Sequence, residues 1–418
     1  MNLLTFLGTA SYSPTTYTLA DKQHTTCYCP AAVAHFYRPD TTLVVVTDAA
    51  KAKHFETLAD EISAVTRPVA VSIPDGHSEA DLWQIFEALT EHVKEKDELI
   101  VDITNGFRSL PFLSFLAIAF LRLARQVTVQ NVFYGAWDAR NEANESPIFD
   151  LTPFVTLLDW TIATDRFTRF GDASDLADLL RAGMPPGPLM GKDLEARALG
   201  HSLKDTAKAM ENVSLALRLT RPLETMTSAA HLTQTLAEVG PRISQTARPY
   251  GLLARQIQTA YQPLALAGAP LARENWPVNL QIQLDLVERY LTQGQIVQAV
   301  TLAREWLVSL LVYRFEAGSM TDYEGDRKPV ELALSNVAER VRGGSRPPRH
   351  SRFDAALQAL PDHQEIGKLW ADLTHLRNDM AHVGMKSVSS DAVSLRRRAE
   401  ALYPRLSQIG QTLLAEVL

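Results

Sequence analysis

Short apolar runs rich in β-branched residues alternate with longer segments of helical pattern over residues 1–153. Strands this apolar are typical of a parallel sheet that is buried on both faces, because the intervening helices cover it. The pattern therefore predicts a Rossmann-like, doubly wound parallel sheet as the N-terminal domain. One intervening helix is predicted from Ser78 to Lys96, with Ser78 and Asp81 in the spacing of a capping box. The predicted strands are residues 3–8, 41–48, 67–73, 97–104 and 127–137.

The rest of the chain is predicted to be helical, in two parts. Residues 154–276 read as a helical connector interrupted by proline-containing turns, and residues 277–418 read as a C-terminal helical domain. A chain of 418 residues is longer than one hydrophobic core usually supports, which agrees with several domains. The predicted fold class is therefore α/β plus all-α.

The balance of charge argues against a general affinity for nucleic acid. The net charge is -7 and the isoelectric point about 5.9, so a contact with RNA depends on a local basic patch. The two cysteines, Cys27 and Cys29, are one residue apart, which disfavours a disulfide and a four-ligand zinc site. The chain starts without the basic segment of a signal peptide, and its longest apolar stretch carries Arg122. We expect a cytoplasmic protein without a metal or a membrane partner.

The fourth predicted strand ends in a turn with the chemistry of an anion site. Thr104, Asn105 and Gly106 follow the strand, and Arg108 lies at the predicted start of the next helix. Ligands of doubly wound sheets bind beyond the carboxyl ends of the strands, where helix N-termini offer unpaired N–H groups. Glycine lets the backbone approach a phosphate, and arginine neutralises its charge. The alternative is an ordinary strand-to-helix turn, for which Asn-Gly is a common pair.

The segment after the first predicted strand, residues 8–13, is predicted to form the opposite wall of this site. It lacks the G-x-G-x-x-G spacing of dinucleotide-binding turns, so we expect a phosphate-rich ligand rather than a nicotinamide cofactor. The candidate residues in this wall are Thr9, Ala10, Ser11 and Tyr12.

A second constellation is RNDMAH, residues 377–382, where an arginine precedes one of the eleven histidines by five positions, the one such place in the sequence. A histidine such as His382 can move protons near neutral pH at a ribose 2′-hydroxyl or a leaving oxygen. Arg377 can hold the scissile phosphate and stabilise its transition state, and Asn378 can orient either side chain. These residue types suffice for RNA cleavage without a metal. A metal site built on His375 and His382 is disfavoured because no third ligand is evident.

The helical periodicity constrains how this pair could work. On a straight helix Arg377 and His382 are about 140° apart and do not converge. A working site therefore requires a bend near Met380 or a second subunit related by two-fold symmetry. The alternative is a surface role, in which Arg377 pairs with Asp379 or Glu365 and His382 is merely a polar residue.

An arginine-rich loop precedes these last helices. No acidic residue occurs between Val341 and Phe353. The loop is either a solvated connection or an arm that contacts phosphates. Its arginines are Arg342, Arg346, Arg349 and Arg352.

Taken together, these motifs closely resemble the CRISPR-associated CARF/HEPN ribonucleases. The resemblance spans the chain and rests on GTASYSPTTY after the first strand, on DITNGFRSLPF at the fourth, and on RNDMAH near the C-terminus. It implies a CARF sensor domain, residues 1–153, and a HEPN ribonuclease domain, residues 277–418. It also implies a homodimer, or a higher oligomer, that a cyclic oligoadenylate from a type III CRISPR complex activates allosterically in antiviral defence.

The resemblance carries roles to individual residues. The expected activator is a cyclic oligoadenylate, with cyclic tetra-adenylate the first choice, and the expected substrate is single-stranded RNA. Relatives often carry a histidine or another polar residue where Asn105 stands. Arg377, His382 and Asn378 would be catalytic, and Thr9, Ala10, Ser11, Tyr12, Thr104, Asn105, Gly106 and Arg108 would bind the ligand.

Two other functions remain open at this point. The first is a nucleotide-sensing dimer that regulates or binds a partner without cleaving RNA. Alternatively, its CARF domain also degrades the cyclic oligoadenylate. An ordinary nucleotide-dependent α/β enzyme is disfavoured by the missing glycine fingerprint.

Overall fold

The computed structural model describes residues 1–106, 110–246, 250–385 and 389–415, and the chain divides into two compact units. The first unit is Met1–Asp159 and the second is Trp160–Leu418. The first unit ends within α6 (Thr152–Phe170), slightly beyond the border predicted at residue 153. The border predicted between residues 276 and 277 lies inside the second unit, at the start of α12 (Trp276–Thr292), and stays a prediction.

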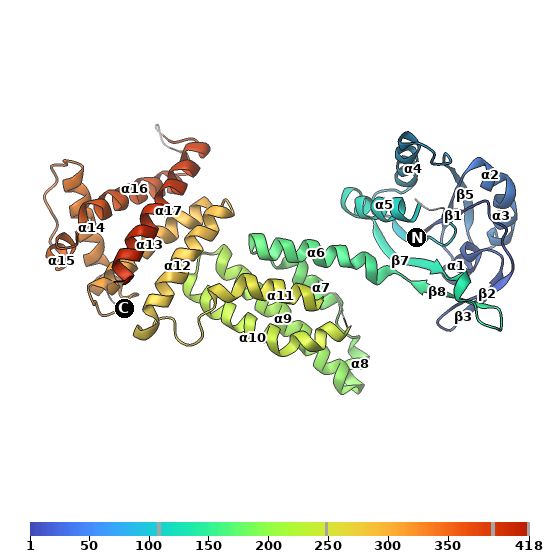
Figure 1. Cartoon of the computed structure of the whole chain (residues 1–418), viewed down its shortest axis with the longest axis horizontal. Helices are drawn as coiled ribbons and strands as arrows, with labels where there is room; N and C mark the ends of the chain where they lie inside the picture. Colours follow the sequence, from blue (N-terminus) through green and yellow to red (C-terminus); the bar gives the residue numbers. More distant parts are fainter. Residues whose placement is uncertain (107–109, 247–249, 386–388, 416–418) are drawn as a thin grey trace. The chain divides into compact units, whose positions relative to one another are not determined.

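An eight-stranded sheet forms the centre of the first unit (Figure 1). The five predicted strands are present as β1, β4, β5, β6 and β7, and they pair in parallel with one another. The sheet order is β3-β2-β8-β7-β6-β1-β4-β5. The strands are β1 (Asn2–Leu7), β2 (Thr15–Leu19), β3 (Lys22–Thr26), β4 (Thr41–Val46), β5 (Arg67–Ser72), β6 (Glu98–Asp102), β7 (Thr128–Gly135) and β8 (Glu145–Asp150).

Three strands fall outside the prediction and make the sheet mixed rather than wholly parallel. β8 runs antiparallel to β7, β2 pairs in parallel with β8, and β3 forms an antiparallel hairpin with β2. These strands extend one side of the sheet and carry polar residues; β3 reads KQHTT, and β8 contains Pro147. The Rossmann-like fold class is confirmed, with a mixed extension beside its parallel centre.

Helices cover both faces of the sheet, and each strand contributes alternate side chains to two cores. In β1, Leu4 packs in the core beneath α4 and α5, whereas Leu3 packs in the core beneath α1 and α3. Ser78 caps α4 as predicted, because its Oγ accepts the backbone N–H of Asp81 at 3.2 Å. The helical segments of this unit are α1 (Cys29–Tyr37), α2 (Asp48–Ala50), η1 (Lys51–Phe55), α3 (Glu56–Ile62), α4 (Glu79–Glu91), α5 (Leu110–Ala124) and η2 (Trp137–Ala139).

The second unit consists of helices and the loops that connect them, with no strand among its described residues, as the sequence predicts. α13 (Ile296–Arg314) is the one described helix whose length and hydropathy would suffice to cross a membrane, but 61% of that stretch is buried, as is typical of a core helix. The other helices are α7 (Ser174–Ala182), α8 (Gly187–Lys192), α9 (Leu194–Arg218), α10 (Pro222–Thr246), α11 (Tyr250–Tyr261), η3 (Gln262–Leu264), η4 (Arg273–Asn275), η5 (Tyr323–Arg327), α14 (Lys328–Val341), α15 (Asp354–Gln358), α16 (His363–Ala381) and α17 (Ala392–Ala415).

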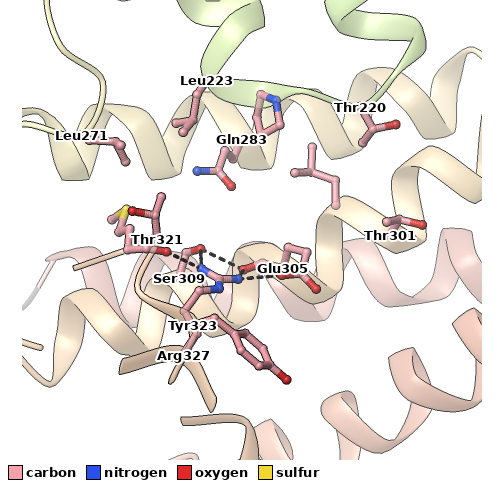
Figure 2. Close-up of a pocket in the computed structure, with 13 residues that line it drawn as sticks. Thr220, Leu223, Leu271, Gln283, Thr301, Glu305, Ser309, Thr321, Tyr323 and Arg327 are labelled. Carbon is pink, nitrogen blue, oxygen red and sulfur yellow. Dashed lines mark hydrogen bonds and ion pairs between the residues drawn. The ribbon is translucent and has the colours of Figure 1, made fainter. Parts of the chain in front are cut away.

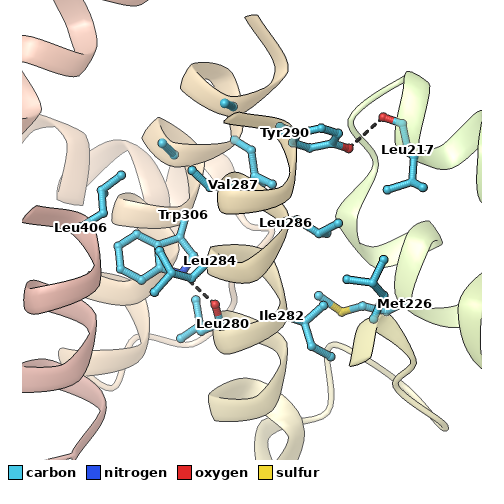
Figure 3. Close-up of a cluster of buried hydrophobic side chains, with 14 of the residues drawn as sticks. Leu217, Met226, Leu280, Ile282, Leu284, Leu286, Val287, Tyr290, Trp306 and Leu406 are labelled. Carbon is cyan, nitrogen blue, oxygen red and sulfur yellow. Dashed lines mark hydrogen bonds between the residues drawn. The ribbon is translucent and has the colours of Figure 1, made fainter. Parts of the chain in front are cut away.

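One continuous hydrophobic core runs through the second unit, and α12 lies at its centre (Figure 3). The Tyr290 hydroxyl donates to the Leu217 carbonyl at 2.8 Å, which joins α12 to α9. On the other side, the Trp306 indole N–H donates to the Leu280 carbonyl at 2.8 Å, which joins α13 to α12. Both aromatic side chains are buried. The predicted connector and the predicted C-terminal domain therefore share one core.

Candidate functional site

The carboxyl ends of β1, β4 and β6 lie at the same edge of the parallel sheet. β4 and β5 lie on one side of β1, and β6 and β7 lie on the other, so the order of the parallel strands reverses between β1 and β6. Doubly wound folds bind ligands at such a switch point. The turns after these two strands meet there, since a Cβ atom added to Gly8 would lie 3.3 Å from the Asn105 carbonyl oxygen. The two predicted walls thus meet at this switch point, which we call the candidate ligand crevice.

A buried carboxylate holds the turn that follows β6. Asp102 is fully buried, and its Oδ1 accepts the backbone N–H of Thr104 at 3.1 Å and also its hydroxyl. Its Oδ2 accepts the Thr5 hydroxyl at 2.7 Å. Thr104 Oγ1 in turn accepts the backbone N–H of Gly135 at 2.7 Å, which ties the turn to β7. Asp102 therefore fixes the backbone of the turn, a role that the sequence analysis did not identify.

The stability of the protein is expected to fall as the pH rises through the titration of Asp102. Burial raises the pKa of this carboxyl above its ordinary value, although hydrogen bonds from Thr104 and Thr5 favour the ionised form. The unfolded chain therefore releases this proton at a lower pH than the folded chain, and ionisation above about pH 4 opposes folding. Urea unfolding between about pH 4 and about pH 8 should show a smaller decline for Asp102→Asn than for the wild type. Equal declines in both proteins would contradict this expectation.

Tyr12 stabilises the turn after β1, which is the first predicted wall of the site. Its hydroxyl accepts the Gly8 backbone N–H at 2.9 Å, and its ring packs against His54 with a centroid distance of 4.6 Å. Burial raises the pKa of the Tyr12 hydroxyl, so this group stays protonated near neutral pH. The predicted residues Thr9, Ala10 and Ser11 lie exposed in the same turn.

A third segment, which the sequence analysis missed, reaches this wall from the end of β4. Lys53 Nζ donates to the Thr9 carbonyl at 2.7 Å and lies 3.5 Å from Ser11 Oγ. His54 is buried beside it, with Nε2 2.8 Å from the Ala10 carbonyl. Both belong to η1, a single π-helical turn, and such turns are frequent at functional sites. The available signal was their position just after a strand of the parallel sheet.

The turn after β6 carries an unpaired donor. Asn105 Nδ2 is buried and has no hydrogen-bond partner among the described residues. A buried polar group left unpaired costs about 1–3 kcal/mol, which an acceptor on a ligand would offset. At Gly106, an added Cβ atom would lie 3.2 Å from Leu110 Cβ, so the turn packs closely on α5. The predicted ligand residue Arg108 lies outside the described residues.

The predicted catalytic residues lie exposed at the end of α16. Arg377 Nη1 donates to Asn378 Oδ1 at 3.0 Å, so the structure brings these two side chains together. His382 is the C-cap residue, and its backbone N–H donates to the Asn378 carbonyl at 3.3 Å. Within the described residues no hydrogen bond joins the side chains of Arg377 and His382. Their roles stay predictions.

The structure shows the end of α16 near Met380, where a bend in a continuing helix was one of the two predicted arrangements. α16 stops at Ala381, and the chain turns through Val383 and Gly384, whose φ angles are 46° and 77°. The Met385 backbone N–H donates to the His382 carbonyl at 2.7 Å and closes this turn. Left-handed backbone is strained for a β-branched residue, so surrounding contacts must maintain it. The turn presents His382 at the tip of the helix rather than on its side.

Glu365 and Asp379, the two acidic residues considered as surface partners of Arg377, form contacts with other residues. Glu365 Oε1 accepts from Arg405 Nε at 2.6 Å, and its other oxygen lies 3.9 Å from Lys368 Nζ. Asp379 is buried, and its Oδ2 accepts the backbone N–H of Ser390 at 3.1 Å. Asp379 therefore helps to hold the segment that follows the turn.

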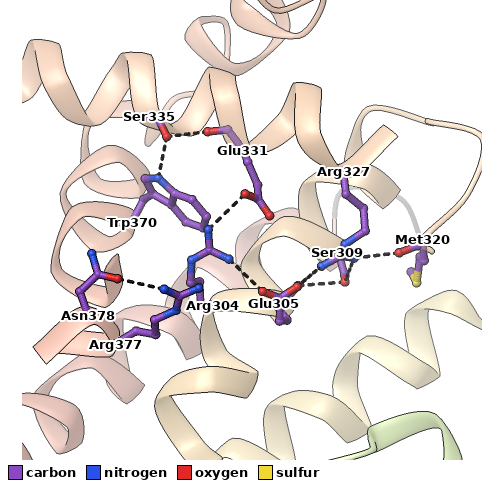
Figure 4. Close-up of polar contacts among 10 residues, drawn as sticks. All are labelled: Arg304, Glu305, Ser309, Met320, Arg327, Glu331, Ser335, Trp370, Arg377 and Asn378. Atoms are coloured by element: carbon purple, nitrogen blue, oxygen red, sulfur yellow. Dashed lines mark hydrogen bonds and ion pairs between the residues drawn. The ribbon is translucent and has the colours of Figure 1, made fainter. Parts of the chain in front are cut away.

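A polar network anchors α16 to its neighbours (Figure 4). The Arg304 guanidinium of α13 lies 4.4 Å from the centre of the Trp370 ring and binds Glu305 at 2.9 Å and Glu331 at 3.2 Å. The Trp370 indole N–H donates to Ser335 Oγ at 3.2 Å. Cation–π and charge-assisted contacts of this kind are strong where side chains are shielded from water. The helix that carries Arg377 is thus fixed to α13 and α14.

A cavity of about 390 Å³ lies elsewhere in the second unit, and the residues lining it come from α10, α12, α13 and η5 (Figure 2). Its main charged groups bind one another: Arg327 contacts Glu305 Oε2 at 2.7 Å and Ser309 Oγ at 2.8 Å. A paired guanidinium offers little to a ligand. None of the predicted site residues lines this cavity.

Comparison with known proteins identifies the first unit. Residues 2–138 match the family described as the CARF domain of the CRISPR system endoribonuclease Csx1. Residues 156–263 match the family described as the second domain of the CRISPR-associated protein MJ1674. The CRISPR-associated protein MJ1674 of Methanocaldococcus jannaschii is 28% identical to this chain over 137 residues, which are 31% of this chain and 22% of the relative.

These matches agree with the architecture. The first covers the parallel sheet and both walls of the crevice, and the second covers most of the predicted connector. The helices from α12 onward, including the one with the predicted catalytic residues, lie outside both matches. The chain is therefore similar to CRISPR-associated CARF proteins, and its N-terminal unit matches a CARF domain of the Csx1 kind.

Proposed function

We propose that this protein is a metal-independent endoribonuclease of the HEPN type, activated by a cyclic oligoadenylate, that cleaves single-stranded RNA in type III CRISPR antiviral defence. The observation that carries the proposal is the exposed set Arg377, Asn378 and His382 at the end of α16, in a chain with a Csx1-type CARF domain. An arginine and a histidine that are both exposed at one helix end are accessible to a polyanionic substrate.

The chemistry follows from these side chains. The ribose 2′-oxygen attacks the adjacent phosphorus and the bond to the 5′-oxygen breaks, which leaves a 2′,3′-cyclic phosphate and a 5′-hydroxyl. A histidine such as His382 takes the proton from the 2′-hydroxyl or gives one to the 5′-oxygen. The Arg377 guanidinium binds the phosphate and stabilises the charge of the transition state. In a dimer, two copies of His382 can share the two proton transfers.

The crevice between β1 and β6 suits a phosphate-containing activator. Lys53 brings a positive charge to the turn of Thr9 and Ser11, and Asn105 Nδ2 offers an unpaired donor on the opposite wall. A cyclic ligand with two-fold symmetry can contact the same groups in two subunits. Binding shifts the protein toward an active arrangement only if the ligand prefers that arrangement.

We propose that the second subunit packs on the exposed apolar face of α5. This helix begins just beyond the turn after β6, so a two-fold contact there would bring two crevices together. Large exposed apolar patches on a protein mark interaction sites. The exposed apolar side chains of α5 are Phe112, Phe115, Leu116, Phe120 and Leu123.

A charge on this face is expected to separate the subunits. Phe112 is 66% exposed, and a glutamate in its place would meet its own copy near the two-fold axis, where like charges repel. Phe112→Glu should sediment as a monomer and lose activator-dependent cleavage. The matched control is Leu252→Glu, at a 68% exposed position of α11. A dimeric Phe112→Glu protein would exclude this face as the contact.

The proposal is tested by cleavage of a fluorescent single-stranded RNA in EDTA during a titration with cyclic tetra-adenylate or cyclic hexa-adenylate. Cleavage that rises with one activator supports the proposal and gives the ring size. Binding of the activator without cleavage would instead favour a regulatory or partner-binding protein. Analysis of the labelled activator after incubation shows whether the CARF domain degrades it.

A further inference from the structure

The arginine-rich segment between α14 and α15 is an exposed loop that the proposed chemistry leaves unused. We call residues 342–352 the basic loop. Its residues from 342 to 350 are exposed, and it contains four arginines and no acidic residue. The chain as a whole carries a net charge of -7, so a polyanion would be attracted only where positive charge is concentrated locally.

The backbone of the basic loop is held in place by α14. Asn336 is buried, and its side chain donates to the Arg349 carbonyl at 2.6 Å and accepts the Arg349 N–H at 3.0 Å. Glu339 Oε1 accepts the Arg346 backbone N–H at 3.3 Å. These contacts use the backbone of both arginines. Within the described residues, the guanidinium groups of Arg346 and Arg349 form no hydrogen bond or ion pair.

The first arginine of the loop reaches the helix with the predicted catalytic residues. Arg342 Nη1 donates to His375 Nε2 at 2.5 Å. His375 and Asn378 lie about 60° apart by helical periodicity, and His375 precedes the end of α16 at Ala381 by about 9 Å along the axis. The basic loop therefore begins beside the face of α16 that leads to His382.

Three carboxylates lie against the basic loop, those of Asp326, Glu339 and Asp354, and Asp354 Oδ2 accepts the Ser351 backbone N–H at 3.1 Å. Asp326 pairs with Arg352 at 2.5 Å and so cancels the charge at the far end of the loop. Glu339 lies near the backbone of Arg346 and is the acidic side chain closest along α14. Glu339 and Asp354 bind the backbone of the loop, and within the described residues no ion pair joins a carboxylate to Arg342, Arg346 or Arg349. Arginine offers phosphate a planar, bidentate set of donors.

We propose that the basic loop binds the phosphate backbone of single-stranded RNA and guides the strand along α16 toward His382. Arg342, Arg346 and Arg349 are then substrate-positioning residues and not catalytic ones. This inference rests on the proposed ribonuclease function for the identity of the partner. Its binding step does not depend on cleavage, so the two can fail separately.

The test is a measurement of RNA binding by the full chain. A labelled single-stranded RNA with 2′-O-methyl groups at every ribose lacks the nucleophile and stays intact. The triple variant Arg342→Ala/Arg346→Ala/Arg349→Ala should bind it about 10-fold or more weakly at about 0.1 M salt. The slope of log affinity against log salt should fall by about 2, since each single-strand phosphate contact contributes about 0.7.

Two further proteins make the result specific. The triple replacement of the same arginines by lysine should keep most of the salt slope, because the charges remain. Arg255→Ala, at an exposed position of α11, should bind as the wild type does. With cleavable RNA and activator, the triple alanine variant should raise KM and leave kcat nearly unchanged.

Each result either supports or contradicts RNA binding by the basic loop. Unchanged affinity and salt slope in the triple alanine variant would overturn the inference, as would the absence of RNA binding by the wild type. Equal affinity of the loop for polyglutamate would overturn the assignment to RNA. Loop-dependent RNA binding without cleavage under any activator would leave the inference standing and reject the ribonuclease proposal.

Discussion

Replacing Arg377 and His382 together with alanine should lower the rate of activated RNA cleavage by about 10³-fold or more. General acid–base catalysis by one side chain contributes about 10²–10⁴-fold, and loss of the charged phosphate contact adds to it. Neither residue lies in the CARF unit, so the affinity for cyclic oligoadenylate should not change. Single-turnover cleavage and activator binding, measured on the same preparation, check both parts.

The single variants and a matched control sharpen this result. Arg377→Lys keeps the charge but loses the planar donor pair, so an intermediate rate is expected. The double variant Arg255→Ala/His201→Ala removes an exposed arginine and an exposed histidine from other helices of the same unit and should cleave normally. Full cleavage by Arg377→Ala/His382→Ala would place the active site elsewhere in the chain.

Trp306→Ala should lower the free energy of unfolding of the helical unit by about 3–5 kcal/mol. The side chain is fully buried, and its removal leaves a cavity that the surrounding helices can only partly fill. Its ring also packs closely on α17, since a Cβ atom added to Gly410 would lie 3.2 Å from it. The hydrogen bond from the indole N–H to the Leu280 carbonyl is lost as well.

Urea unfolding followed by far-ultraviolet circular dichroism measures this loss, with the two compact units fitted as separate transitions. Leu215→Ala, at a 58% exposed position of α9, should change the free energy of unfolding by no more than about 0.5 kcal/mol. A loss below about 1 kcal/mol for Trp306→Ala would mean that the core closes around the missing ring.

The parts of the fold that the sequence predicts are those where burial dominates. β4 reads TTLVVV and is buried from its second residue onward, so its apolar run identifies it without knowledge of its neighbours. β3 and β8 could not be recognised in this way, because polar residues and Pro147 interrupt their patterns. Their strand character depends on pairing with β2 and β7, which only the folded chain brings to them.

The residues of the candidate site also differ in whether the sequence alone could predict them. Thr104 and Asn105 follow a recognisable strand, so their place at the edge of the sheet could be predicted. Lys53 and His54 could not, because their contacts with the turn after β1 arise from the sheet order and from a π-helical turn. The position of His382 could not be predicted from helical periodicity, because that calculation assumes a helix that continues past Ala381.

The continuous core of the second unit makes its helices mechanically dependent on one another. Tyr290 ties α12 to α9, Trp306 ties α13 to α12, and Trp370 joins α16 to this body through Arg304. A close-packed interior passes a displacement on instead of absorbing it. A displacement of α9 is therefore expected to reach α16 through the packed side chains that join α9, α12, α13 and α16.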